Sequence, residues 1–127
     1  MGGTADGGSE EAAVVADRAT VGAARGLAPP PGRRSVLLMR HGSMSLRYYA
    51  PRGRDDQQPH AQDELYVVIA GSGRFVHDGN SMPFGPGDVL FAAAGRPHRF
   101  EDFTDDFEAW VVFYGPSGGE AAGHNRE

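Results

Sequence analysis

The chain has 127 residues, a formal net charge of −5, no cysteine and no lysine, so all 12 basic residues are arginine. Without cysteine there is no disulfide, no thiolate nucleophile and no cysteine zinc site. Without lysine there is no Schiff-base amine and no P-loop lysine. The only adjacent basic pair is Arg33-Arg34, and nucleic-acid surfaces need clustered cations, so we expect no nucleic-acid partner.

The sequence also gives no indication of a membrane partner. No apolar run approaches the roughly 20 residues that a membrane helix needs. The first residues lack a basic region followed by an apolar segment, which a secretory signal would show. We therefore expect a soluble, cytoplasmic protein.

Residues 1–33 form a Gly/Ala/Pro-rich N-terminal arm. Ser9 precedes two glutamates and could cap a short helix, but the apolar stripe that follows is weak. The segment ends in Pro29-Pro30-Pro31-Gly32, which stops any regular element. We expect a flexible or partly helical arm, and the alternative is a segment that packs across a partner subunit.

Residues 34–116 alternate between short β-rich runs and turn clusters. Asp78-Gly79 predicts a hairpin turn because both positions tolerate a positive φ. About eight strands without a helix between them favour an all-β, antiparallel jelly-roll barrel. We expect residues 117–127 to form a polar tail after it. The predicted strands include residues 35–40, 43–49, 64–70, 74–77, 89–92, 98–100 and 109–114.

Four polar residues stand out on this β background: Gln58, His60, Glu64 and His98. Imidazole and carboxylate are ligands that a first-row transition metal accepts when thiolate is absent. On a straight strand, His60 and Glu64 would share a face with Cα atoms ~13 Å apart, so a common ion requires a bend or bulge between them. Judged by residue type alone, a histidine and a glutamate on one β-face are more often surface residues than ligands.

The spacing of these residues resembles the two motifs of the cupin superfamily. Residues 58–71 resemble the first motif, H-x-H, three or four residues, E, six residues, G. Residues 87–102 resemble the second, G, five residues, P-x-G, two residues, H, three residues, N. The similarity covers roughly residues 35–116 and is that of a small single-domain cupin. The matching positions are His60, Glu64, Gly71, Gly87, Gly95 and His98.

The sequence departs from the cupin pattern at three motif positions. Gln58 replaces the leading histidine, Ala93 the proline and Asp102 the asparagine. The last two affect turn geometry, whereas Gln58 affects the metal site. An amide oxygen is a weaker ligand than imidazole, so Gln58 either coordinates weakly, hydrogen-bonds beside the ion, or takes no part.

The resemblance implies one divalent transition metal ion, Fe, Mn, Ni, Co or Zn, held by His60, Glu64 and His98. It also implies a small-molecule substrate. The chemistry would be O₂ activation, as in dioxygenases, or Lewis-acid catalysis, as in isomerases and lyases. The alternative is a cupin that binds a metal or a small ligand without catalysis.

Strand alternation adds candidate pocket residues to this implied site. Tyr66 would face inward with Glu64, and Phe100 would lie beside His98, although core packing is the competing role for both rings. Arg47 is the further pocket candidate, because an arginine facing the barrel would bind a substrate anion.

The opposite face of the strand that carries Glu64 is also apolar. Leu65, Val67 and Ile69 alternate with the inward residues, so a second sheet, the arm or another subunit must cover them. Because cupins commonly pair through such sheets, we expect a homodimer.

Overall fold

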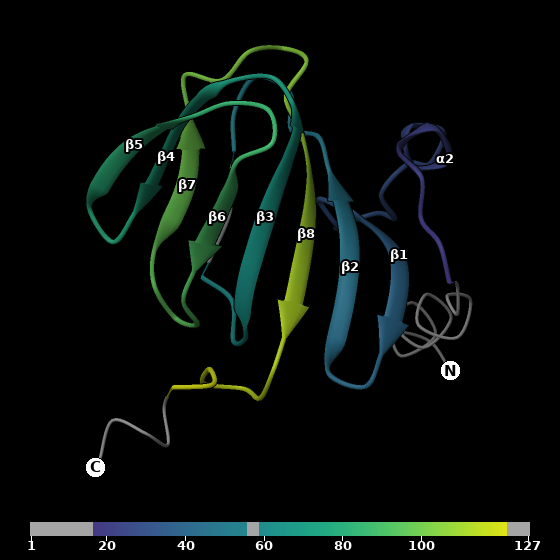
Figure 1. Cartoon of the computed structure of the whole chain (residues 1–127), viewed down its shortest axis with the longest axis vertical. Helices are drawn as coiled ribbons and strands as arrows, with labels where there is room; N and C mark the ends of the chain where they lie inside the picture. Colours follow the sequence, from purple (N-terminus) through teal and green to yellow (C-terminus); the bar gives the residue numbers. More distant parts are fainter. Residues whose placement is uncertain (1–16, 56–58, 122–127) are drawn as a thin grey trace.

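The computed structural model describes residues 17–55 and 59–121. These residues form one short helix, α2 (Val21–Arg25), and eight strands (Figure 1). None of the described residues forms a helix long and apolar enough to cross a membrane. The strands are β1 (Val36–His41), β2 (Met44–Tyr49), β3 (Asp63–Ala70), β4 (Gly73–His77), β5 (Asn80–Phe84), β6 (Val89–Ala92), β7 (His98–Glu101) and β8 (Glu108–Tyr114).

The strands make two sheets in which all pairs are antiparallel. The larger sheet has the order β1-β2-β8-β3-β6 and the smaller one the order β5-β4-β7 (Figure 1). His77 pairs with Asn80 across the turn at Asp78-Gly79, so the predicted hairpin is confirmed. The prediction of an all-β, antiparallel barrel is confirmed as well.

An aromatic core fills the space between the two sheets. Tyr66 on β3 meets Phe100 on β7 edge to face, with ring centroids 4.8 Å apart. Phe100 also lies 4.7 Å from Phe107 and 5.4 Å from Phe84. Each buried ring contributes about 2 kcal/mol of hydrophobic stabilisation. This packing fixes the distance between the sheets, and it gives Phe100 the core role that competed with a pocket role.

Gly71 directly follows β3, at a position where a residue with a Cβ would not fit. Its φ is +88°, and a Cβ there would lie 2.4 Å from the Cα of Phe107. The backbones can therefore approach closely enough for Thr104 N to donate to the carbonyl of Ser72 at 2.9 Å. The glycine of the first motif thus locks the β3–β4 turn onto the segment that leads into β8.

At Asp102, aspartate can replace the asparagine of the second motif with little change in the turn after β7. Its φ is +53°, in the left-handed region. Asparagine and aspartate both tolerate this region better than other residues with a Cβ. The chain therefore leaves β7 by the same kind of turn with either residue.

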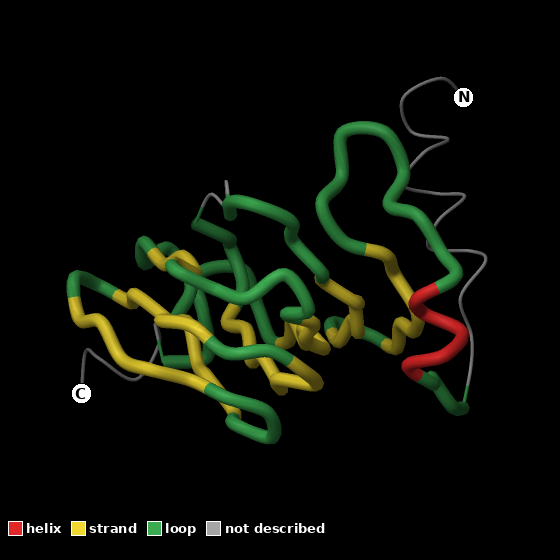
Figure 2. The backbone as a smooth tube through the Cα atoms, turned by 90° about the horizontal axis from the view of Figure 1, so that it is seen from above, coloured by secondary structure: helices red, strands yellow, loops and turns green. Residues whose placement is uncertain are grey.

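A polar contact attaches the helix α2 to the large sheet. Arg25 donates from Nε and Nη2 to the carboxylate of Glu108, both at 2.7 Å, and the Tyr48 hydroxyl donates to the same carboxylate. The hydrogen bonds from Arg25 lower the pKa of Glu108 to about 2, so the contact weakens only in strong acid. Figure 2 shows α2 and the loop after it at one end of the molecule.

We predict that Gly71→Ala destabilises the protein much more than Gly79→Ala. Both glycines have a positive φ, but only Gly71 has backbone atoms where the new methyl group would lie. Positive φ alone costs about 1–3 kcal/mol, and the clash adds to this at Gly71. Urea unfolding of both variants measures the difference, and equal losses would contradict the close-approach argument.

Candidate metal centre

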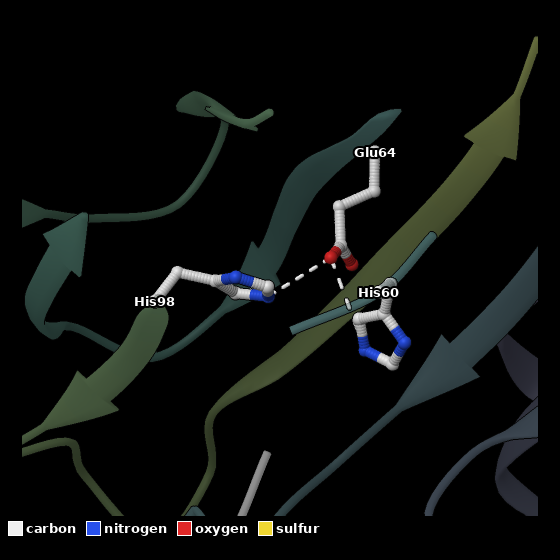
Figure 3. A group of neighbouring side chains, drawn as sticks. All are labelled: His60, Glu64 and His98. Atoms are coloured by element: carbon white, nitrogen blue, oxygen red, sulfur yellow. Dashed lines mark ion pairs between the residues drawn. The ribbon is translucent and has the colours of Figure 1, made fainter. Parts of the chain in front are cut away.

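His60, Glu64 and His98 converge at one end of the barrel interior. His60 lies in the loop before β3, Glu64 is on β3, and His98 begins β7. His98 Nε2 lies 2.9 Å and His60 Nε2 3.9 Å from Glu64 Oε1 (Figure 3). One potential ligand atom from each residue lies within 4.8 Å of the others. The three predicted ligands therefore come from both motifs to a single point.

A bend in the chain brings His60 and Glu64 together. The backbone bends at Ala61 and Gln62, directly before β3 begins. The Gln62 side-chain amide donates to the carbonyls of Ser43 at 3.0 Å and Gly115 at 2.9 Å, which holds the bend in place. This is the irregularity that the spacing of His60 and Glu64 required.

The orientation of His98 fixes which of its nitrogens can bind a metal. Nδ1 lies 3.1 Å from the carbonyl oxygen of Arg96. A carbonyl only accepts, so Nδ1 carries the hydrogen, and in the neutral ring Nε2 carries the lone pair. Metal-binding histidines are typically held this way, with the other ring nitrogen donating to a carbonyl or carboxylate.

Two buried atoms at this point lack hydrogen-bond partners in the described part of the chain. They are Oε2 of Glu64 and Nε2 of His98. In the neutral ring Nε2 has no hydrogen to donate to Glu64 Oε1, 2.9 Å away, and the Glu64 residue is only 1% exposed. Burying such groups without a partner is costly. A divalent cation would be coordinated by both, so the residues present fit a metal.

The two histidines differ in their readiness to give up a proton. Burial lowers the pKa of His60 below its ordinary value, against the attraction of Glu64. Burial alone would also lower the pKa of His98, but the Glu64 carboxylate outweighs it and raises the pKa. A cation entering the site therefore meets a neutral His60 and competes with a proton at His98.

A cavity of about 400 Å³ opens beside the three candidate ligands. His60 and Glu64 line it, and so do Tyr66 and Arg47, two of the three predicted pocket residues. The third, Phe100, is in the aromatic core described above and is not among the residues that line this cavity. Gln58 lies outside the described residues, so its role stays a prediction.

Three further arginines, which the sequence analysis did not propose as pocket residues, also line the cavity. Arg33 and Arg34 are in the loop before β1, and Arg40 is on β1. The pairing of β1 with β2 shifts between Leu37 and Met39, as at a β-bulge. The extra residue places Arg40 on the same face as Leu37, whereas regular alternation would place them on opposite faces.

Asp63 ties the bend to two other segments. Its carboxylate accepts from Ala94 N at 2.9 Å and from Glu120 N at 2.9 Å. The neighbouring Gly95 N donates to the carbonyl of His60 at 2.8 Å. The position of His60 therefore depends on the β6–β7 loop and on the segment after β8, both of which Asp63 anchors.

An antiparallel barrel with two histidines and a carboxylate inside defines a class of small β-barrel proteins with a potential metal site. The sequence model of the cupin domain family matches residues 45–113, and the chain belongs to this family. The resemblance seen in the two motifs is thereby confirmed.

Two curated proteins illustrate the similarity. An uncharacterized protein of Streptomyces coelicolor is 34% identical over 83 residues, which cover 64% of this chain and 79% of that protein. Dimethylsulfoniopropionate lyase DddQ of Ruegeria pomeroyi is 33% identical over 57 residues, which cover 44% of this chain and 28% of the lyase. The second match is thus confined to a part of the lyase.

Solved structures support the same fold. A structural-genomics protein of unknown function from Rhizobium leguminosarum superposes with a TM-score of 0.65 at 20% identity, covering 80% of this chain and 99% of that one. A Cupin 2 conserved barrel domain protein from Salinispora arenicola gives 0.57 at 24% identity, covering 80% and 89%. At these identities the likeness shows the barrel and not the activity.

We predict that Asp63→Asn loosens the segments around His60. Asparagine keeps one acceptor oxygen but turns an NH₂ group toward one of the two backbone N–H donors, so one hydrogen bond is lost at a cost of about 1–3 kcal/mol. Hydrogen exchange at the amides of Ala94 and Glu120 should accelerate. Asp78→Asn is the matched control, because Asp78 is exposed and contacts Arg96; unchanged exchange in Asp63→Asn would refute the anchoring role.

Proposed function

We propose that this cupin holds one divalent metal ion at His60, Glu64 and His98 and acts with it on a small organic molecule. The observation that carries the proposal is the pair of buried, unpartnered atoms, Glu64 Oε2 and His98 Nε2, that share this site. Two histidines and one carboxylate with open positions suit Fe(II), and also accept Mn, Ni, Co or Zn. Gln58 is proposed as a weak fourth ligand or a hydrogen-bond partner beside the ion.

When bound, such an ion supplies either Lewis-acid polarisation of a substrate oxygen or, as Fe(II), activation of O₂. The chain's own residues do the positioning. The Arg96 carbonyl orients His98, the bend at Ala61 presents His60, and Glu64 supplies the single negative charge among the three ligands. The Tyr66 ring forms a wall of the cavity beside them.

Partial similarity to a lyase supports Lewis-acid chemistry of the lyase or isomerase type. The matched part of DddQ is short, and cupin sites host many reactions, so dioxygenase-like O₂ activation is the second candidate. Substrate turnover separates both from a cupin that only binds a ligand. The assay compares O₂ consumption and product formation over a panel of small organic substrates with Fe(II), Mn²⁺ and Ni²⁺; turnover with any ion would rule out the binding-only role.

We also propose a homodimer that forms through the outer face of the large sheet. Apolar side chains continue across this face from strand to strand, because the register places them side by side. Val89 and Phe91, on the edge strand β6, are 59% and 45% exposed. A face of this kind favours burial against a second copy. One such row is Leu46, Val112, Leu65 and Phe91, and the next is Tyr48, Trp110, Val67 and Val89.

We predict that the protein purified without chelator carries about one transition metal ion per chain, as the three-ligand site requires. Removing one ligand by His60→Ala should weaken binding at least about a hundredfold. Elemental analysis and metal titration measure both. His41→Ala is the matched control, since His41 is exposed.

The pH dependence of the same titration gives a second check. Protons compete for His98, whose pKa is raised, so metal binding should weaken as the pH falls and recover as it rises. Well under one ion per chain in the wild type, with no effect of His60→Ala, would sink the proposal of a metal site.

We predict that light scattering at micromolar concentration gives twice the chain mass of 13.5 kDa. Phe91→Arg should shift the protein to the monomer, because a charge would have to be buried in an apolar interface. Met82→Arg is the matched control, since Met82 is an exposed apolar residue on β5 of the other sheet. A monomeric wild type would contradict the dimer.

A further inference from the structure

We infer that the loop between α2 and β1, residues 26–35, is a strap that closes one side of the cavity beside the candidate metal centre. A latch on the opposite face of the large sheet holds the strap closed. This latch is the contact of Arg25 and Tyr48 with the carboxylate of Glu108. Access to the cavity is a property beyond the proposed function, because it matters whatever the cavity binds.

The strap supplies one wall of the cavity. Its last four residues, 32–35, line the cavity together with the candidate ligands His60 and Glu64. Residues 32–34 are also exposed on their other side. An exposed segment that lines a cavity lies between that cavity and the solvent, so the position of the strap sets how open the cavity is.

The latch lies on the outer face of the large sheet, away from the cavity. Arg47 and Tyr49 on β2 line the cavity, so Tyr48 between them points to the other face. Glu108 shares that face with Trp110 by alternation along β8, and the Trp110 ring lies 6.0 Å from the Tyr48 ring. The strap therefore crosses from the outer face to the cavity at the start of β1, the edge strand of the sheet (Figure 2).

The latch is what keeps α2 in place. Arg25 donates two hydrogen bonds of 2.7 Å to a Glu108 carboxylate group in a residue that is 5% exposed, and bidentate pairs of this kind are strong. Ala24 beside it is fully buried. A helix of five residues is unstable by itself. We therefore expect α2 to unfold and leave the sheet when the latch is broken.

The strap is stiff enough to carry a movement of α2 to the cavity. Residues 30–33 match a type II turn, in which Arg33 N donates to the carbonyl of Pro30 at 2.9 Å and Gly32 has a φ of +79°. Pro31 stands at the second position of this turn, where its fixed φ fits. Because the turn moves as a unit, release of one end of the strap should displace the cavity wall at the other end.

The test uses the full chain without metal and has two readouts. Arg25→Gln removes the charge of the latch, so hydrogen exchange at the amide of Ala24 should accelerate at least about tenfold. Reaction of His60 with diethyl pyrocarbonate measures access to the cavity, and this reaction should accelerate at least about twofold as the strap opens. Only 38% of the His60 side chain is exposed in the structure, which leaves room for the increase.

Arg74→Gln is the matched control for the substitution. Arg74 donates from Nε to the hydroxyl of Ser81 on the small sheet, so both rates should stay at their wild-type values. The exposed His41 gives the reference rate for diethyl pyrocarbonate in each variant. Equal acceleration in Arg74→Gln would contradict a specific role of the latch.

The two readouts separate the two parts of the inference. Unchanged exchange at Ala24 in Arg25→Gln would refute the latch. Faster exchange at Ala24 with an unchanged rate at His60 would refute the strap as a wall that controls access. Tyr48→Phe removes one hydrogen bond of the latch and keeps the ring, so it should change both rates in the same direction and serves if Arg25→Gln fails to fold.

Added Mn²⁺ separates this inference from the proposed function. An ion bound at His60 should protect that ring from diethyl pyrocarbonate. Missing protection, with the response to Arg25→Gln intact, would count against the metal site and support the strap. Protection by Mn²⁺ without any response to Arg25→Gln would overturn the strap and leave the metal site standing.

Discussion

The buried carboxylate of Glu64 is the constraint on which the rest of the site depends. A negative charge that is 1% exposed is too costly to keep in a protein interior unless something positive is near. The nearest group is the imidazole of His98, 2.9 Å away, and its Nδ1 is already committed to the Arg96 carbonyl. The barrel therefore brings two hydrogen-bond acceptors together, the Glu64 carboxylate and His98 Nε2. A proton or a cation must lie between them.

The position of the candidate metal site depends on both sheets of the barrel, because its ligands come from both of them. Glu64 is on β3, in the large sheet, and His98 begins β7, in the small one, so the aromatic core between the sheets sets their separation. The last strand, β8, lies between β2 and β3, and the segment after it reaches Asp63. The site is complete only when β8 has joined the sheet, so it depends on contacts between residues far apart in the sequence.

The sequence could predict the strands and the Asp78-Gly79 hairpin, because alternation and turn chemistry are periodic or local features. It could predict the convergence of His60, Glu64 and His98 only because the two segments that carry them resemble the cupin motifs. It could not predict that Arg40 faces the cavity, since one extra residue near Leu38 reverses the alternation and nothing in residue type marks a bulge. The anchoring role of Asp63 was also hidden, because its partners, the amides of Ala94 and Glu120, are backbone groups.

A proton on His98 and a metal ion exclude each other at this site. The stability of the fold therefore depends on pH and on metal binding together. In the metal-free chain Glu64 raises the pKa of His98, so the protonated pair stabilises the fold below the pKa of an unfolded histidine. That contribution is lost as the pH rises through the higher folded value. At that pH the unprotonated Nε2 and the carboxylate repel each other, and a divalent ion gains most by binding. The same burial that makes the charged Glu64 carboxylate costly to keep thus makes an occupant of the site necessary.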